Sequence, residues 1–253
     1  ARSFYDFYLF GGFYRGVRIV EKEPKIFVRT LDYRTGLIEV EVEGGRKFRK
    51  TLKDFKLWSP EEPNMTTIEV DGRKVRFGVR QIEARDKKLW LNGKELFLKG
   101  VNRHDQSPLG GATVPEIEWV QDLQHLKDLG GNFIRGAHYQ QADRFLELCD
   151  EMGVLVWEES LGWGNGQDYT KSVGDCTDPE FREQQIKQTR DMVRNSFNHP
   201  SVIIFSFLNE PGSTTKECKS LIDELIATVK AENSGRLVTF ACNMGVNDIC
   251  NDN

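Results

Sequence analysis

The feature that most constrains the fold is a regular alternation of short apolar segments with longer amphipathic segments after Lys99. Strand-like segments occupy residues 96–104, 132–138, 154–159, 202–210 and 237–242, and helix-like segments occupy residues 115–129, 142–152, 178–197 and 214–232. Asp178 and Pro179 stand where an N-cap and a first helical residue are favoured, and Gly153 follows the end of a predicted helix. This alternation predicts a parallel sheet covered by helices. The series is shorter than the eight strands of a (β/α)8 barrel, so we expect an incomplete barrel.

Short strand patterns dominate the chain before Lys99. Residues 37–43 alternate strictly, with Ile38, Val40 and Val42 on one side and glutamates on the other, which is typical of a strand with one solvated face. Three dipeptides with strong turn preference separate such runs, namely Gly44-Gly45, Asp71-Gly72 and Asn92-Gly93. We therefore expect an all-β sandwich ahead of the barrel.

Composition is that of an ordinary globular chain. Of 253 residues, 38% are hydrophobic and 29% are charged, and the net charge of −4 gives no electrostatic reason to expect nucleic acid or a membrane as partner. The five cysteines match no metal motif, so we expect neither a metal site nor a cofactor, and free thiols favour the cytoplasm. The opening ARSFYDFY resembles a cut end, so an earlier signal peptide would escape notice.

Polar residues collect where the predicted strands end. The first strand ends in His104, the second runs from Arg135 to His138, and the third ends in Glu159, shortly before Trp163. The fourth, SVIIFSFLNEP, breaks from an apolar run into Asn209, Glu210 and a proline. Because parallel strands place their carboxyl ends on one face of a barrel, we expect these side chains to surround one pocket.

Such a set of residues suits a sugar, because hydroxyls need paired donors and acceptors and a sugar ring packs on Trp. Glycosidic cleavage requires two carboxyl groups flanking the bond, one of them held protonated. We expect Glu210, at the end of a buried strand, to have a raised pKa, because burial disfavours the anion.

Simpler interpretations exist for each residue. Glu210 could be the N-cap of the following helix, His104 and His138 could be core histidines bonded to the backbone, and Arg135 could pair with Glu159 as internal support. Glu158 is expected to face away from the pocket. The repetition of polar residues at successive strand ends favours a site over these alternatives.

Three segments together resemble glycoside hydrolase family 2, the β-galactosidase and β-glucuronidase family: GVNRHDQSPLGG, NFIRGAHYQQADRFLELCDEMGVLVWEE and NHPSVIIFSFLNEP. FGGFYRGVRI resembles the end of the family's sugar-binding jelly roll, and FKLWSPEEPN and VRFGVRQIE resemble parts of its immunoglobulin-like domain. The resemblance implies the end of a jelly roll at 1–14, a shortened immunoglobulin-like β-sandwich at 15–85 and the first part of a TIM-barrel catalytic domain at 86–253.

The resemblance also implies a retaining glycosidase. Glu210 matches the acid/base, and Asn209 matches the residue that bonds the sugar 2-hydroxyl. His104, Arg135, His138 and Glu159, with Trp163 beside them, match or adjoin pocket-lining positions. The family's nucleophile follows a seventh strand, so the chain resembles a fragment truncated before it, and we expect little turnover from the fragment alone.

The substrate stays open between a β-galactoside and a β-glucuronide. Asp105, Phe205 and the HYQQ segment depart from the usual family pattern and leave the sugar preference undecided. The alternative function is a non-catalytic carbohydrate-binding module derived from such an enzyme. The partner expected in either case is a carbohydrate, and the full-length parent could form a homo-oligomer.

Overall fold

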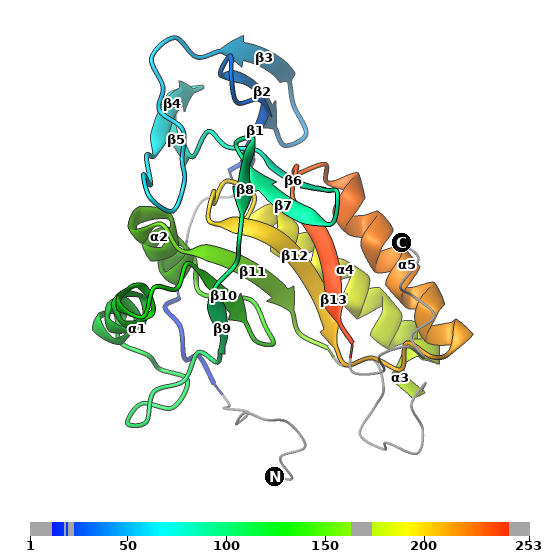
Figure 1. Ribbon diagram of the computed structural model, residues 1–253. Helices are drawn as coiled ribbons and strands as arrows, with labels where there is room; N and C mark the ends of the chain where they lie inside the picture. Colours follow the sequence, from blue (N-terminus) through cyan, green and yellow to red (C-terminus); the bar gives the residue numbers. More distant parts are fainter. Residues whose placement is uncertain (1–11, 18, 20–22, 163–173, 243–253) are drawn as a thin grey trace.

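The computed structural model describes residues 12–17, 19, 23–162 and 174–242 (Figure 1). Small antiparallel sheets form one end of the molecule, and a parallel sheet covered by helices forms the rest. The antiparallel sheets lie beyond the amino ends of the parallel strands, so the opposite, carboxyl ends are left for a site.

The first two antiparallel sheets enclose a small apolar core. One sheet contains β1 (Ile26–Asp32), β2 (Leu37–Val42) and β3 (Lys47–Thr51), and the other contains β4 (Thr66–Val70) and β5 (Arg73–Phe77). Ile38 and Val40 from the first sheet pack with Val75 and Phe77 from the second. The turns expected between β2 and β3 and between β4 and β5 are confirmed.

The glutamate face of β2 was expected to be solvated, and this expectation is wrong at Glu39. It is only 7% exposed. Arg29 on β1 and Lys47 and Arg49 on β3 form ion pairs with its carboxylate across the sheet. The strict alternation is thus present, but these cationic side chains cover the polar face at this point.

A third antiparallel sheet joins the sandwich to the barrel. It consists of β6 (Ile82–Arg85), β7 (Lys88–Leu91) and β8 (Lys94–Leu96), with the predicted Asn92-Gly93 turn between β7 and β8. Ile82 and Leu91 pack with Trp58 against the barrel residues Leu155 and Ile204. The single strand expected over 96–104 is wrong, because the structure divides it between β8 and the first parallel strand.

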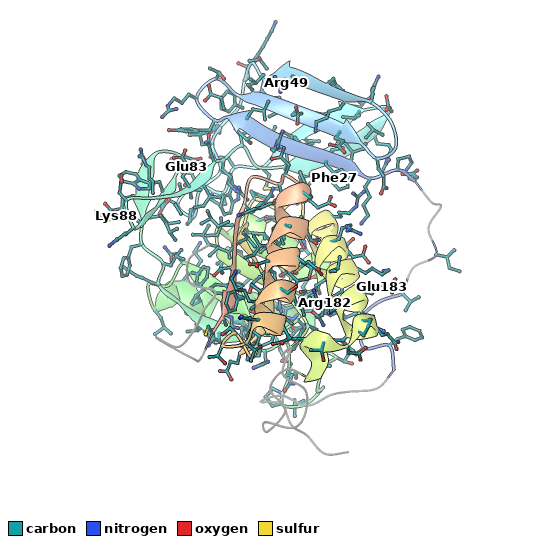
Figure 2. The ribbon with its side chains drawn as sticks, turned by 90° about the vertical axis from the view of Figure 1, so that its right-hand side faces the viewer. Phe27, Arg49, Glu83, Lys88, Arg182 and Glu183 are labelled. Atoms are coloured by element: carbon teal, nitrogen blue, oxygen red, sulfur yellow. The ribbon has the colours of Figure 1, made fainter. Side chains whose placement is uncertain are left out.

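The parallel sheet has the predicted topology. Its strands are β9 (Gly100–Arg103), β10 (Phe133–Gly136), β11 (Leu155–Ser160), β12 (Val202–Asn209) and β13 (Leu237–Ala241), and they neighbour each other in sequence order. The helices are α1 (Glu116–Asp128), α2 (Asp143–Met152), α3 (Gly174–Thr177), α4 (Pro179–Asn195) and α5 (Lys216–Ala231). Figure 2 shows α4 and α5 side by side across the sheet. Parallel strands in sequence order with helices between them are the arrangement that a (β/α)8 barrel repeats.

The main core lies between this sheet and its helices. Every residue of β12 is buried, and Phe205 and Phe207 pack in the core cluster with Leu221 and Leu225 of α5. Asp178 caps α4 as predicted, accepting a hydrogen bond from the Glu180 amide at 3.0 Å. The rigid packing around β12 fixes where its carboxyl end lies.

Two general features complete the fold. No disulfide joins the cysteines in the described ranges, although Cys176 Sγ lies 2.7 Å from Cys218 Sγ; Cys250 lies outside those ranges. Within the part of the chain that the structure describes, none of the helices combines the length and apolarity needed to cross a membrane.

Candidate active site

Arg135 connects three parallel strands at their carboxyl ends. It lies on β10, and its Nη2 donates to Glu159 Oε2 on β11 at 2.9 Å and to Asn209 Oδ1 at the end of β12 at 2.8 Å. Its Nε also donates to Glu159 at 3.0 Å. The prediction that these strand ends bring Arg135, Glu159 and Asn209 together is therefore met by direct contacts.

Glu159 is fully enclosed. Its exposed fraction is 0%, and besides Arg135 its carboxylate accepts hydrogen bonds from Trp157 Nε1 at 3.1 Å and Ser206 Oγ at 3.4 Å. His138 Nδ1 lies 2.8 Å from its Oε1. Both carboxylate oxygens are occupied and the group has no exposure, so the pairing of Arg135 with Glu159 that the sequence allowed is present.

The two histidines follow β9 and β10 and meet at their rings. The His104 and His138 ring centroids are 5.4 Å apart in an edge-to-face arrangement, and the Tyr139 ring lies 6.2 Å from that of His104. His138 is 6% exposed and contacts the Glu159 and Arg135 side chains. The His138 Nδ1 atom thus contacts side chains of the strand-end network.

Glu210 occupies a different environment from Glu159. Its amide donates to the Ala241 carbonyl oxygen at 2.8 Å, which places it beside the end of β13. The residue is exposed, so the expected burial of its carboxyl group is wrong. The capping alternative is also wrong, because the Thr215 side chain caps α5, accepting from the Cys218 amide at 3.3 Å.

Asp105 anchors a second polar cluster that sequence reasoning did not identify. Its buried carboxylate accepts from Arg103 Nη1 at 3.0 Å, Trp119 Nε1 at 2.8 Å and Arg15 Nη2 at 3.1 Å. The Tyr139 hydroxyl accepts from its amide at 2.8 Å. Because Tyr139 also contacts His104, this cluster fixes the loop after β9. The adjacency of Asp105 to a strand-end histidine was the available signal.

Glu158 points to the opposite side of β11 from Glu159, as predicted. Its Oε1 accepts from the Gln141 amide at 3.0 Å, and the residue is 1% exposed. Burial raises the pKa of Glu158 to about 7, against smaller lowering effects from the Gln141 hydrogen bond and from His199. Two successive glutamates thus have different tasks, set by the strand's alternation.

Two other expectations concern Trp163 and metals. Trp163 lies outside the described residues. Over the described ranges, no three or more His, Cys, Asp or Glu residues are grouped so as to hold a metal ion. What the described residues provide is a wall of oriented donors and acceptors, next to one exposed carboxylate. Such a wall can bind hydroxyl groups and exchange a proton with a bound group.

The parallel strands with helices between them, and the polar residues at their carboxyl ends, define part of a (β/α)8-type enzyme domain. Residues 82–253 match the TIM barrel domain of the family described as glycosyl hydrolases family 2. The chain belongs to this family.

Similar proteins include the β-galactosidase of Thermoanaerobacterium thermosulfurigenes, 35% identical over 166 residues, which are 62% of this chain and 22% of that protein. Mouse β-glucuronidase is 32% identical over 184 residues, 72% of this chain and 28% of that enzyme. Among solved structures, the β-galacturonidase of Eisenbergiella tayi bound to galacturonate matches with a TM-score of 0.72 at 30% identity, over 90% of this chain and 42% of that one. The chain therefore spans less than half the length of each of these relatives.

Proposed function

We propose that this chain forms part of a retaining β-glycosidase that releases terminal β-linked sugars. Glu210 is the general acid and base, and Asn209 bonds a sugar hydroxyl next to the scissile bond. His104, Arg135, His138 and Glu159 line and orient the site, and Trp163 packs on the sugar ring. Family membership and the contacts that join Arg135, Glu159 and Asn209 support this assignment.

The observation that carries the proposal is the contrast between the two strand-end carboxylates. Glu159 is 0% exposed and its oxygens are occupied by Arg135, His138, Trp157 and Ser206, so it cannot attack a sugar. Glu210 is exposed and directly follows the oriented Asn209, where a leaving oxygen can reach it. The retaining route also needs a nucleophilic carboxylate about 5–5.5 Å from the acid. The resemblance assigns that group to a position after a seventh strand.

We infer that the substrate carries a galactosyl or glucuronyl residue. The similar proteins act, by their names, on β-galactosides, β-glucuronides and β-galacturonides. All three sugar classes share the hydroxyl groups that Asn209 and the histidines would bind. Discrimination between a hydroxymethyl and a carboxylate group at the sugar would come from other positions.

The test uses Glu210→Ala in the full-length product of the gene that encodes this chain. General acid-base catalysis contributes roughly 10²–10⁴-fold, and its loss should depend on the leaving group. The variant should be severely impaired on substrates with alkoxide leaving groups and should still form the glycosyl-enzyme from dinitrophenyl glycosides, which need no protonation. Azide, which needs no general base, should restore turnover and give a β-glycosyl azide.

The matched control is Glu183→Ala, which removes an exposed glutamate on α4, on the helix-covered side of the sheet (Figure 2). It should retain full activity. Equal loss on both leaving-group classes with no effect of azide would refute the acid/base role of Glu210. If the full-length wild-type protein binds galactosides, glucuronides or galacturonides but hydrolyses none of them, the result would instead support a carbohydrate-binding module.

We further propose the domain division suggested by the resemblance. The sandwich of β1–β5 would be a shortened immunoglobulin-like domain within 15–85, preceded at 1–14 by the end of a jelly roll and followed at 86–253 by barrel residues. The shared core between the two sheets supports a separate sandwich unit. Limited proteolysis should cut between β5 and the barrel before it cuts within either.

A further inference from the structure

A cavity of about 290 Å³ lies between the sandwich and the barrel, at the amino ends of the parallel strands. It is thus at the opposite end of the sheet from Glu159 and Asn209. Its lining comes from β1, from the connection between β5 and β6, and from the loops that precede β12 and β13. Ligand pockets usually occupy about 300–1,000 Å³, so this cavity suits a small ligand.

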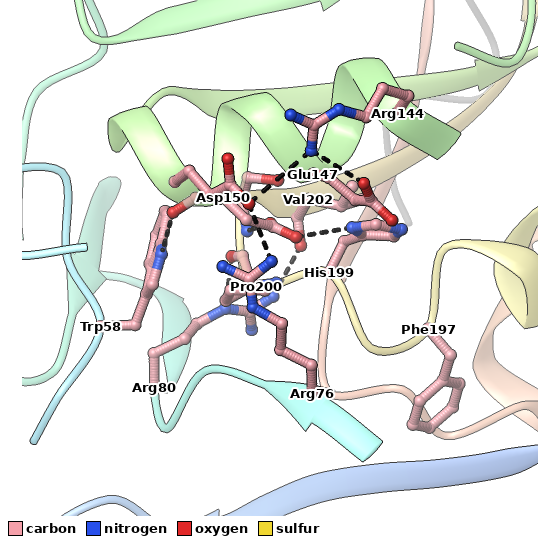
Figure 3. A network of polar contacts seen from close by, with 12 residues as sticks. Trp58, Arg76, Arg80, Arg144, Glu147, Asp150, Phe197, His199, Pro200 and Val202 are labelled. Carbon is pink, nitrogen blue, oxygen red and sulfur yellow. Dashed lines mark hydrogen bonds and ion pairs between the residues drawn. The ribbon is translucent and has the colours of Figure 1, made fainter. Parts of the chain in front are cut away.

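The lining of the cavity is strongly cationic. It includes Arg29, Arg80 and Arg236, and none of the lining residues is an aspartate or a glutamate. Arg80 is 6% exposed and donates from Nε to the Pro200 carbonyl at 2.9 Å and from Nη2 to the Val202 carbonyl at 2.6 Å. Its Nη1 donates to no described residue. Figure 3 shows the Arg80 side chain beside Pro200 and Val202, at the amino end of β12.

Arg236 is held in the same way. It donates to the carbonyl oxygens of Val202 at 3.2 Å, Ser234 at 2.6 Å and His199 at 3.0 Å, and also to Phe197. These partners are all neutral. The Arg80 and Arg236 guanidinium groups therefore both donate to the Val202 carbonyl oxygen, and neither is bonded to a carboxylate.

The nearby carboxylates are already engaged. Glu39, which pairs with Arg29, also pairs with Lys47 and Arg49. Asp150 lies near Arg80 but accepts from the Ser201 amide at 3.0 Å and contacts His199 Nδ1 at 2.6 Å (Figure 3). Cationic groups therefore outnumber the carboxylates around the cavity.

Burial and the shortage of counter-charge both bear on the pKa values of the two arginines. Burial lowers the pKa of Arg80 to about 10, and Asp150 offsets only part of this effect. Burial, followed by repulsion from Arg80, also lowers the pKa of Arg236 well below its usual value. Buried charge without a counter-charge is unfavourable, so a bound anion would stabilise both groups.

We propose that this cavity binds an oxyanion of the phosphate or sulfate type, either free or as an ester group. Guanidinium groups recognise such oxyanions through paired N–H donors. Arg29 supplies a partly exposed guanidinium at the cavity wall, and Arg80 and Arg236 supply two further positive charges held in place by backbone carbonyl groups. Because the site joins the sandwich to the barrel, occupancy would strengthen the contact between these two parts.

The experiment measures binding of inorganic phosphate and inorganic sulfate to the full chain by isothermal titration calorimetry. Sodium chloride at equal ionic strength is the reference, and glucose 6-phosphate and a sugar sulfate ester distinguish a free ion from an ester group. We expect saturable binding at one site per chain. Arg29→Gln should weaken it at least tenfold, and the melting temperature should rise with the anion in wild type but not in the variant.

Arg49→Gln is the matched control, because Arg49, on β3 (Figure 2), also pairs with Glu39 but is not among the residues that line the cavity. It should leave the anion affinity unchanged. Absence of saturable binding in the wild-type chain, or equal weakening by Arg29→Gln and Arg49→Gln, would overturn the proposal. In the first case, the arginines serve only to hold the carbonyl groups.

Discussion

Replacement of Arg135 by methionine should expose how far the site depends on one cation. Methionine keeps much of the side-chain volume but removes the guanidinium group that Arg135 directs at Glu159, His138 and Asn209. The Glu159 carboxylate would stay 0% exposed and lose its charge partner. Removal of one member of a buried ion pair costs about 3–5 kcal/mol, so the free energy of unfolding should fall by about that amount.

The assay is urea denaturation of the chain, followed by fluorescence and circular dichroism. A double-mutant cycle with Glu159→Gln isolates the pair, because the double variant buries neither charge. Each single variant should lose about 3 kcal/mol or more, and the double variant should lose much less than their sum.

The control is Arg76→Met, since Arg76 forms an exposed pair with Glu151 and such pairs contribute about 0–1 kcal/mol. A loss below about 1 kcal/mol for Arg135→Met, or additive effects in the cycle, would refute the argument that Arg135 neutralises a buried carboxylate.

Two further predictions concern single positions. The pKa of Glu158 is about 7 in the folded chain against an ordinary value of 4.5, so the folded state holds a proton that the unfolded state releases. The stability that this group contributes is therefore present below pH 4.5 and lost as pH rises to about 7, an effect of roughly 3 kcal/mol on the free energy of unfolding. Glu158→Gln should be more stable than wild type at pH 8, and the free energy of unfolding measured in urea should depend less on pH in this variant. Gly100→Ala would place a Cβ 1.9 Å from the Phe133 carbonyl oxygen across the β9–β10 pair. Thermal unfolding should therefore show a loss of stability on the order of 1–3 kcal/mol or more. The control Gly16→Ala, whose Cβ meets nothing within 4 Å, should be neutral.

The barrel strands and helices could be predicted because local punctuation coincides with tertiary structure. Asp178 and Pro179 mark the start of α4, and Gly153 adopts the left-handed conformation just after α2. The apolar run of β12 is long enough to indicate a strand buried on both faces. These signals are local, so no knowledge of the sheet order was needed to find them.

For the network at the strand ends, the sequence predicts which side chains lie near one another but not which of them form hydrogen bonds or ion pairs. Parallel topology places Arg135, Glu159 and Asn209 at one end of the sheet. Which group neutralises which depends on side-chain reach between strands. For the same reason, the cluster around Asp105 was missed: its partner Arg15 lies 90 residues away in the sequence, and its partner Trp119 lies on the next helix, α1.

The exposure of Glu210 shows why the apolar run misled the sequence argument. In a regular strand, the residue after the inward-pointing Asn209 would point to the helix-covered face and be buried. The backbone instead takes positive φ angles of 53° at Leu208 and 49° at Glu210, and the pairing with β13 shifts register between Ser206 and Asn209. Left-handed conformations cost non-glycine residues about 1–2 kcal/mol each, and leucine and glutamate are not among the residue types that adopt them readily. Such irregularities re-aim side chains at functional sites. Burial of β12 supplies the packing that holds the strained end in place, and the strain leaves Glu210 in solvent while Asn209, one residue earlier, remains bonded to Arg135.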